Sequence, residues 1–137
     1  MSDTSISPLT FRSVGLGVSD LRRSVDFYTR VCGMVELQTY HLSYMDEVII
    51  GFVEDGVTQG ARLVLMHWTD GSPRNYQDNP VKIVFQVPDA RAFADRVRAA
   101  GYEIPREPGK SSVSNNVVGF ARDPDGYQIE ILQVTAG

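Results

Sequence analysis

The residue with the clearest potential for chemistry is Glu130, which lies in the apolar segment Ile129-Glu130-Ile131. Successive residues of a strand point to opposite faces, so the two isoleucines share one face and Glu130 lies on the other. An unpaired carboxylate is very costly to bury, and the face that carries Glu130 must therefore be at least partly polar. The alternation alone leaves two interpretations open, a carboxylate in a functional site or a solvated carboxylate near a strand edge.

The same alternation assigns faces in two other predicted strands. Large apolar residues should pack against helices, so their neighbours in the sequence should line the opposite face. This rule places a lysine on the same kind of face as Glu130. The residues predicted to line a cavity are Ser13, Gly15 and Gly17 in the first strand, Lys82, Val84 and Gln86 in a later strand, and Gln128, Glu130 and Leu132 in the last strand.

The strands that position these residues belong to a degenerate tandem repeat. A strand over Phe11 to Val18 is followed by Asp20 as a helix N-cap, and Gly33 stands where the helix should end. The pattern returns with a strand over residues 82–87, with Asp89 as the N-cap 69 positions after Asp20, and with a terminal glycine at position 101. We expect helices near Asp20 to Cys32 and near Asp89 to Ala100.

Three strand-like segments follow each helix, so each half of the chain reads βαβββ. We predict an α+β fold: one domain over residues 1–137, built from modules 11–68 and 81–134. Its eight strands should form a cupped sheet with helices on the convex face and a cavity on the concave face. The predicted strands are Val35 to Thr39, Glu47 to Glu54 and Ala61 to His67 in the first half, and Tyr102 to Arg106, Asn116 to Arg122 and Tyr127 to Val134 in the second.

Composition restricts the classes of partner. The 137 residues, 42% of them hydrophobic, suit one globular domain. A net charge of −4 and scattered basic residues give no reason to expect nucleic acid or an anionic membrane as a partner. No apolar run approaches the roughly 20 residues that span a bilayer, and a single cysteine, Cys32, excludes an internal disulfide. We therefore expect a cytoplasmic protein in which Cys32 is a packing residue.

Two motifs resemble the glyoxalase I family. The first runs from Val18-Ser19-Asp20-Leu21 through Ser24-Val25-Asp26-Phe27-Tyr28 to Gly33-Met34, and the second is Asp123-Pro124-Asp125-Gly126-Tyr127 followed by Ile129-Glu130. Together with the tandem βαβββ repeat, they are similar to the vicinal oxygen chelate superfamily of glyoxalases, bleomycin-resistance proteins and extradiol dioxygenases. The resemblance covers Phe11 to Gln133, and it implies a small-molecule ligand and a homodimer.

The resemblance also implies where a metal would be held. Members that use a divalent ion bind it through a His or Gln, a Glu, a His and a Glu on the concave face, and the ion acts as a Lewis acid. Here the last Glu is Glu130, but the other three positions are Ser13, Val64 and Lys82. Valine cannot ligate, and a lysine ammonium repels a divalent ion. We therefore expect no metal and no other cofactor.

The two histidines of the chain do not replace the missing ligands. His67 shares its strand face with Leu63 and Leu65, which places it away from the cavity. His41 lies in the loop or strand edge Tyr40 to Tyr44 and is a candidate substrate contact. The glutathione-contact positions of glyoxalase I carry Gly17 and Trp68, so we do not expect glutathione-dependent methylglyoxal conversion.

Two functions fit these observations. The first is a metal-independent lyase or isomerase that binds a small oxygenated or carbonyl-containing molecule, in which Lys82 stabilises an enolate and Glu130 moves the proton. The head groups of Lys82 and Glu130 should then approach within about 4 Å or share one bridging water. The residues predicted to bind substrate are Ser13, Val64, Arg62, Gln86, His41, Tyr44 and Trp68.

The alternative is a drug- or metabolite-sequestering protein of the bleomycin-resistance type, which would stack an aromatic ligand on side chains such as Trp68, Tyr44, Tyr40 and Phe52. A third reading, an extradiol dioxygenase, needs two histidines and a carboxylate around iron, and Lys82 and Val64 argue against it.

Overall fold

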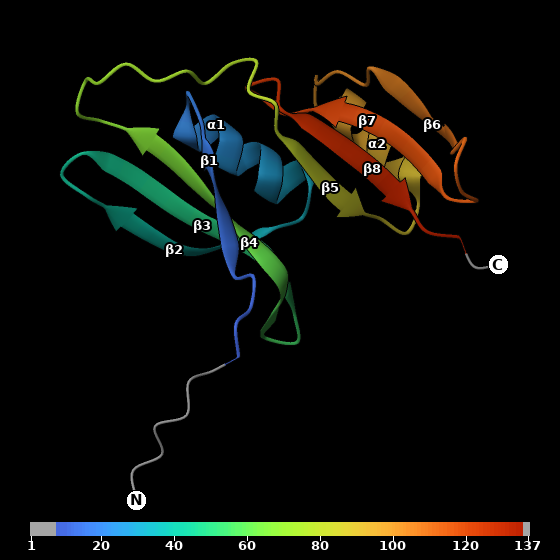
Figure 1. Ribbon diagram of the computed structural model, residues 1–137, viewed down its shortest axis with the longest axis horizontal. Coiled ribbons are helices and arrows are strands. Elements are labelled where there is room, and N and C mark those ends of the chain that lie inside the picture. Colours follow the sequence, from blue (N-terminus) through green and yellow to red (C-terminus); the bar gives the residue numbers. More distant parts are fainter. Residues whose placement is uncertain (1–7, 136–137) are drawn as a thin grey trace, which may run out of the picture.

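A computed structural model describes residues 8–135 and shows two βαβββ modules, as the sequence predicts (Figure 1). The first module comprises β1 (Ser13–Gly17), α1 (Leu21–Asp26) with its π-helical continuation η1 (Phe27–Val31), β2 (Val35–His41), β3 (Met45–Glu54) and β4 (Val57–Trp68). The second comprises β5 (Lys82–Gln86), α2 (Ala90–Ala99), β6 (Arg106–Lys110), β7 (Val117–Arg122) and β8 (Gln128–Gln133).

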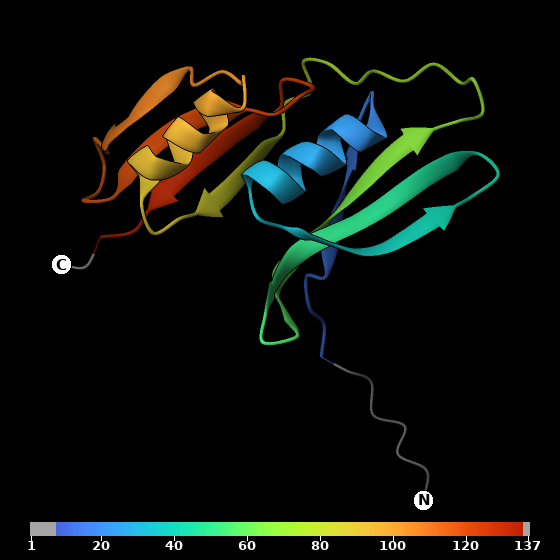
Figure 2. The ribbon, with the colours of Figure 1, turned by 180° about the vertical axis from the view of Figure 1, so that it is seen from behind.

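The eight strands are divided between two four-stranded sheets with the same strand order. The first sheet runs β1-β4-β3-β2 and the second β5-β8-β7-β6, and in each the first strand is parallel to its neighbour while the other pairs are antiparallel. Both helices lie on one side of the sheets, in front of the strands in Figure 2. The α+β class and the tandem modules are thereby confirmed. The faces of the sheets that no helix covers, called the helix-free face below, are where a ligand could bind.

Local chemistry explains where the helices begin and end. The carboxylates of Asp20 and Asp89 accept hydrogen bonds from the backbone N–H of Arg23 (3.1 Å) and Ala92 (3.0 Å), which is N-capping. Gly33 and Gly101 follow the helices with φ of 85° and 94°, a conformation that glycine adopts without steric cost. The predicted helix boundaries are therefore confirmed, with a π-helical turn closing the first helix.

The core joins the two modules. Phe27 and Tyr28 at the end of the first helix are fully buried, and the Tyr28 ring meets Phe85 of β5 edge to face at 6.4 Å. Phe52 of β3 packs against the same Phe85 ring at 5.8 Å. Aromatic pairs of this kind add to the free energy gained by burying their area. Cys32 is buried in this core, and burial raises the pKa of its thiol well above the ordinary value, which supports the packing role expected for it.

A buried hydrogen bond also links the modules. The Tyr28 hydroxyl donates to Asp123 at 2.7 Å, and the same carboxylate accepts from the backbone N–H of Asp125 (2.9 Å) and Tyr127 (2.8 Å). Burial raises the pKa of Asp123, whereas these three hydrogen bonds act to lower it. The pKa of Tyr28 is raised well above its ordinary value, by burial first and then by the negative charge of Asp123. Asp123 thus organises its own hairpin and attaches it to the first helix.

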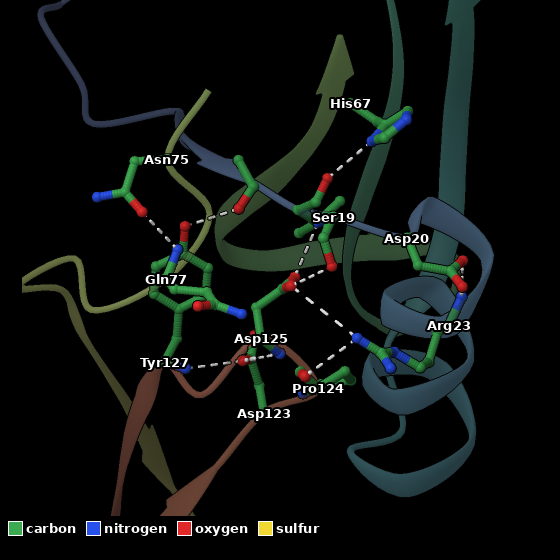
Figure 3. A network of polar contacts seen from close by, with 12 residues as sticks. Ser19, Asp20, Arg23, His67, Asn75, Gln77, Asp123, Pro124, Asp125 and Tyr127 are labelled. Carbon is green, nitrogen blue, oxygen red and sulfur yellow. Dashed lines mark hydrogen bonds and ion pairs between the residues drawn. The ribbon is translucent and has the colours of Figure 1, made fainter. Parts of the chain in front are cut away.

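Figure 3 shows the surroundings of this hairpin. Ser19 donates to Asp125 through both its backbone N–H (3.1 Å) and its hydroxyl. The Arg23 guanidinium donates to the carbonyl of Pro124 at 3.2 Å, and the Tyr127 hydroxyl donates to the carbonyl of Gly17 at 2.7 Å. The Asp-Pro-Asp-Gly-Tyr motif therefore closes the hairpin before β8 and also connects it to the end of β1 and the start of α1.

One predicted strand was misplaced. The strand expected over Tyr102 to Arg106 begins at Arg106 and ends at Lys110. Pro105 has no N–H to donate to a neighbouring strand, and the ladder starts only after it. Pairing with β7 then skips from Arg106 to Gly109, and Gly119 of β7 makes room for the skipped segment, because a Cβ there would lie 2.9 Å from the Pro108 ring.

The described residues include no helix long and apolar enough to cross a membrane.

Candidate functional site

The predicted faces of β5 and β8 agree with the strand register. Lys82 pairs with Gln128 and Val84 with Glu130 in the parallel ladder, so these four side chains share one face. Ile129, on the other face, is fully buried. Glu130 therefore lies on the face of the second sheet that is turned away from the helix, as its two isoleucine neighbours predict.

Lys82 and Glu130 form an ion pair on this face. The Nζ atom of Lys82 lies 3.1 Å from Oε1 of Glu130, which confirms the predicted approach. The Glu130 side chain is 17% exposed and that of Lys82 is 48% exposed. A carboxylate so nearly buried needs a positive partner, and the ammonium provides it while remaining open to solvent on its other side.

Lys82→Ala is expected to lower the free energy of unfolding by about 0.5–1 kcal/mol, because the exposed half of the pair is screened by water. Urea unfolding would measure the change. Lys110→Ala is the matched control, since Lys110 is exposed and forms no ion pair within residues 8–135. A loss equal to that of the control would mean that Glu130 is stabilised by hydration instead of by Lys82.

The first sheet presents the other two positions implied by the family. Ser13 pairs with Arg62 and Gly15 with Val64 in the parallel ladder of β1 and β4, so these four residues share a face. Leu63 and Leu65 of β4 are buried on the opposite face, under the first helix. The predicted assignment of Ser13, Arg62 and Val64 to the helix-free face is consistent with this register.

These residues do not fit a divalent metal ion. Val64 has no donor atom, and the Glu130 carboxylate is already neutralised by Lys82 at 3.1 Å. Within residues 8–135 there is no group of three or more His, Cys, Asp and Glu side chains placed to hold an ion. Ser13 and Glu130 together offer too few donors for a tight site.

Both histidines lie in a different place from the ion pair. The Nδ1 atom of His41 lies 2.9 Å from Asp46, and that of His67 lies 2.9 Å from the carbonyl of Val18. The two rings line one cavity of about 610 Å³ beside the start of α1. For His67 this agrees with the predicted face. For His41 the structure does not bring the residue to Lys82, and its expected contact with substrate stays a prediction.

The remaining predicted substrate contacts divide into two groups. Arg62 and Gln86 line the same groove as Lys82. Trp68 lies at the far end of β4, where the Arg74 guanidinium covers its ring at 4.4 Å, and Tyr44 is 46% exposed in the preceding β2–β3 turn. The structure does not place Trp68 or Tyr44 in that groove. Sequence reasoning missed Gln59, a lining residue, because it precedes the segment assigned to its strand.

The fold and this face define the class of protein. The family model of the Glyoxalase/Bleomycin resistance protein/Dioxygenase superfamily matches residues 10–131, and the chain belongs to this family.

Curated relatives of this chain include lactoylglutathione lyases. The chain is 32% identical over 124 residues to that of Neisseria meningitidis serogroup A, covering 89% of this chain and 88% of the relative. It is 30% identical over 119 residues to the lactoylglutathione lyase of Escherichia coli O157:H7, covering 86% of this chain and 87% of the relative.

Solved structures show the same fold. Glyoxalase I from Zea mays matches with a TM-score of 0.78 at 23% identity, over 92% of this chain but only 45% of the maize chain. Trypanothione-dependent glyoxalase I from Leishmania major matches with 0.75 at 24% identity, over 92% and 87%. TnmS3, an antibiotic-binding protein from Streptomyces sp. CB03234, matches with 0.69 at 19% identity, over 96% and 100%.

Proposed function

We propose that this protein is a metal-independent lyase or isomerase that binds a small oxygenated or carbonyl-containing molecule on the helix-free face. The observation that carries the proposal is the ion pair between Lys82 and Glu130, at two positions where the family places metal ligands. The relatives named lactoylglutathione lyase support a lyase by analogy. A fixed positive charge beside a carboxylate can stabilise an enolate, which is the role of the divalent ion in those family members that use one.

The chemistry follows from the charges of the pair. Glu130 removes a proton from the carbon next to a carbonyl group, and the electrons of the broken C–H bond move onto the carbonyl oxygen. The resulting enolate lies beside the Lys82 ammonium, which no longer faces a charged carboxylate. Negative charge thus passes from Glu130 to the substrate without a change in the net charge of the site. Where the carbon that loses the proton carries a hydroxyl group, the hydroxyl proton moves to the enolate oxygen and the proton held by Glu130 returns to the former carbonyl carbon, which completes an isomerisation. Where the next carbon carries a leaving group, its departure with the bonding electrons re-forms the carbonyl group and completes an elimination.

Glutathione-dependent conversion of methylglyoxal is not part of this proposal. Gly17 has no side chain, and a Cβ there would be in van der Waals contact with the Tyr76 ring at 3.4 Å. Trp68 is covered by Arg74. Neither position offers a polar side chain to a peptide.

Exchange of substrate C–H protons with deuterated solvent tests the proposal, with hydroxyacetone and 2-hydroxyacetophenone as probes followed by NMR. Wild-type protein should accelerate exchange, and both Glu130→Gln and Lys82→Met should lower the rate by about 100-fold or more. Glu54→Gln, which alters an exposed carboxylate at the end of β3, is the control and should have no effect. Exchange that survives both substitutions would refute the assigned roles.

A second candidate function is sequestration of an aromatic molecule. Phe52 lines the groove that contains Lys82, which is the observation that favours it. The same experiment separates the two functions, because a sequestering protein would bind an aromatic probe without accelerating exchange, and Glu130→Gln would leave binding unchanged.

We also propose a cytoplasmic homodimer. Tyr40, Leu42 and Tyr44, around the β2–β3 turn, are exposed to 48%, 37% and 46%, and a partner subunit would cover them. The single buried cysteine fits a reducing compartment.

A further inference from the structure

A groove of about 550 Å³ lies between the two modules. It is bounded by β1 and the first half of β4 on one side and by β5 on the other. β1 and β5 are the end strands of their sheets and lie toward the middle of the molecule (Figure 1). The groove therefore opens between two sheet edges, and Lys82 of the proposed site is one of its lining residues.

Most of the lining is apolar, and part of it is exposed. Phe11 is 73% exposed, Val14 48%, Val81 38% and Val84 46%. All four line this groove. Exposed apolar side chains gathered around one concavity are typical of a ligand site. The deeper lining includes Phe52 and Phe85, which offer aromatic edges to a ligand.

The charged lining has one sign. Arg62 and Lys82 are the cations, and none of the described lining residues is acidic, although the whole chain carries a net charge of −4. Lys82 already faces Glu130, whereas Arg62 makes no ion pair among residues 8–135. Within the part of the chain that the structure describes, Arg62 is therefore the cation of the groove without an anionic partner.

A glycine in the neighbouring strand makes room for the Arg62 side chain. A Cβ built on Gly51 of β3 would lie 3.3 Å from Cγ of Arg62, so the glycine leaves room for the arginine stem to lie across the sheet. The planar guanidinium can bind a carboxylate through two parallel hydrogen bonds. Gln59 and Gln86 add amide groups that can bind a further oxygen of the ligand.

We propose that the groove binds a small aromatic or branched aliphatic carboxylic acid, with the carboxylate on Arg62, the apolar body between β1 and β5, and an additional carbonyl or hydroxyl oxygen directed at Lys82. This inference rests on the proposed function, because it names the class of substrate for the pair formed by Lys82 and Glu130. It adds Arg62 as the residue that selects acids over neutral molecules.

Titration followed by NMR chemical shifts tests the proposal, with phenylpyruvate and 4-phenylbutyrate as acid probes and 4-phenylbutyramide as the neutral analogue. The acids should bind at least about tenfold more tightly than the amide, because the amide loses the charge-assisted hydrogen bonds. Arg62→Met, which keeps an apolar stem, should weaken the acids about tenfold and leave the amide unchanged. Arg91→Met, an exposed change on α2, is the control and should alter neither.

Val84→Asp places a carboxylate in the groove at an exposed position, and it should abolish binding of the acids by charge repulsion. Equal binding of acid and amide, or acid binding that survives both Arg62→Met and Val84→Asp, would overturn the proposal. The protein could also form a dimer that excludes all probes and that Val84→Asp dissociates. That result would overturn the proposal and assign the groove to a second copy of the chain. Glu130→Gln keeps these outcomes separate from the proposed chemistry, because it should remove proton exchange while acid binding persists.

Discussion

Replacing Asp123 with alanine should lower the free energy of unfolding by about 3 kcal/mol, the largest single-residue effect that we expect on stability. The substitution leaves the buried Tyr28 hydroxyl and the backbone N–H groups of Asp125 and Tyr127 without their acceptor. A buried donor that loses its partner costs about 1–3 kcal/mol, and partial hydration of the turn reduces the sum of the three. The loss of the charge itself adds little to this cost, because the charge is disfavoured by burial and repelled by the Asp125 carboxylate, which raise the pKa of Asp123.

Urea unfolding of Asp123→Ala, Asp123→Asn and Asp95→Ala would measure this effect. Asparagine retains an acceptor oxygen and should lose about 1 kcal/mol. Asp95 is an exposed residue of α2 that pairs with Arg98, so its replacement should cost less than about 0.5 kcal/mol. If Asp123→Ala resembled Asp95→Ala, the hairpin would not depend on its buried carboxylate. Combining Asp123→Ala with Tyr28→Phe in a double-mutant cycle isolates the hydrogen bond between the modules.

Restoring the three missing ligands should convert a protein without metal into one with nearly one ion per chain. Wild-type protein purified without chelator should hold no stoichiometric Zn, Ni, Mn or Fe, because Ser13, Val64 and Lys82 provide neither the charge nor the donors. The variant Ser13→His/Val64→Glu/Lys82→His carries the donor set implied by the family together with Glu130. Its apparent zinc affinity should exceed that of wild type by at least about 1,000-fold.

Elemental analysis and zinc-dependent thermal shifts would decide this prediction. The double variant Ser13→His/Val64→Glu is the control, because it retains Lys82 and should bind little metal. Failure of the triple variant to bind an ion, while it still folds, would show that the four positions do not converge. About one metal per chain in wild type, held by Glu130, would show that other side chains reach the site.

Local patterns were sufficient for most of the fold. Asp20 and Asp89 each provide a side-chain oxygen that caps a helix, and the glycines at positions 33 and 101 adopt positive φ at the helix ends. These are interactions between residues a few positions apart, so the sequence contains all the information that they need. β6 is the exception, because its bulge depends on the contact between Pro108 and Gly119 of another strand.

The tight link between the modules was not predicted. The motif Asp123-Pro124-Asp125-Gly126 is typical of a turn, and turn motifs commonly carry aspartate at an exposed position. Its burial against Tyr28 depends on how the first helix packs on the second module, and these residues are 95 positions apart in the chain. The contact of His41 with Asp46 likewise depends on more than local sequence. The residue ends β2 and meets Asp46 across the β2–β3 pair, a register that depends on the length of both strands.

The sequence alone determined which side chains are available for chemistry on the helix-free face. The alternation around Glu130 and Lys82 follows from strand geometry, and the absence of donors at Val64 follows from its side chain. Only the tertiary structure decided that Lys82 and Glu130, 48 positions apart, lie 3.1 Å from each other and that the carboxylate is the less exposed partner. It alone also placed Arg62 and Lys82 in one groove. The physical reason is that strand pairing and the packing of one module on the other are long-range events, and no local pattern specifies the distance between two modules.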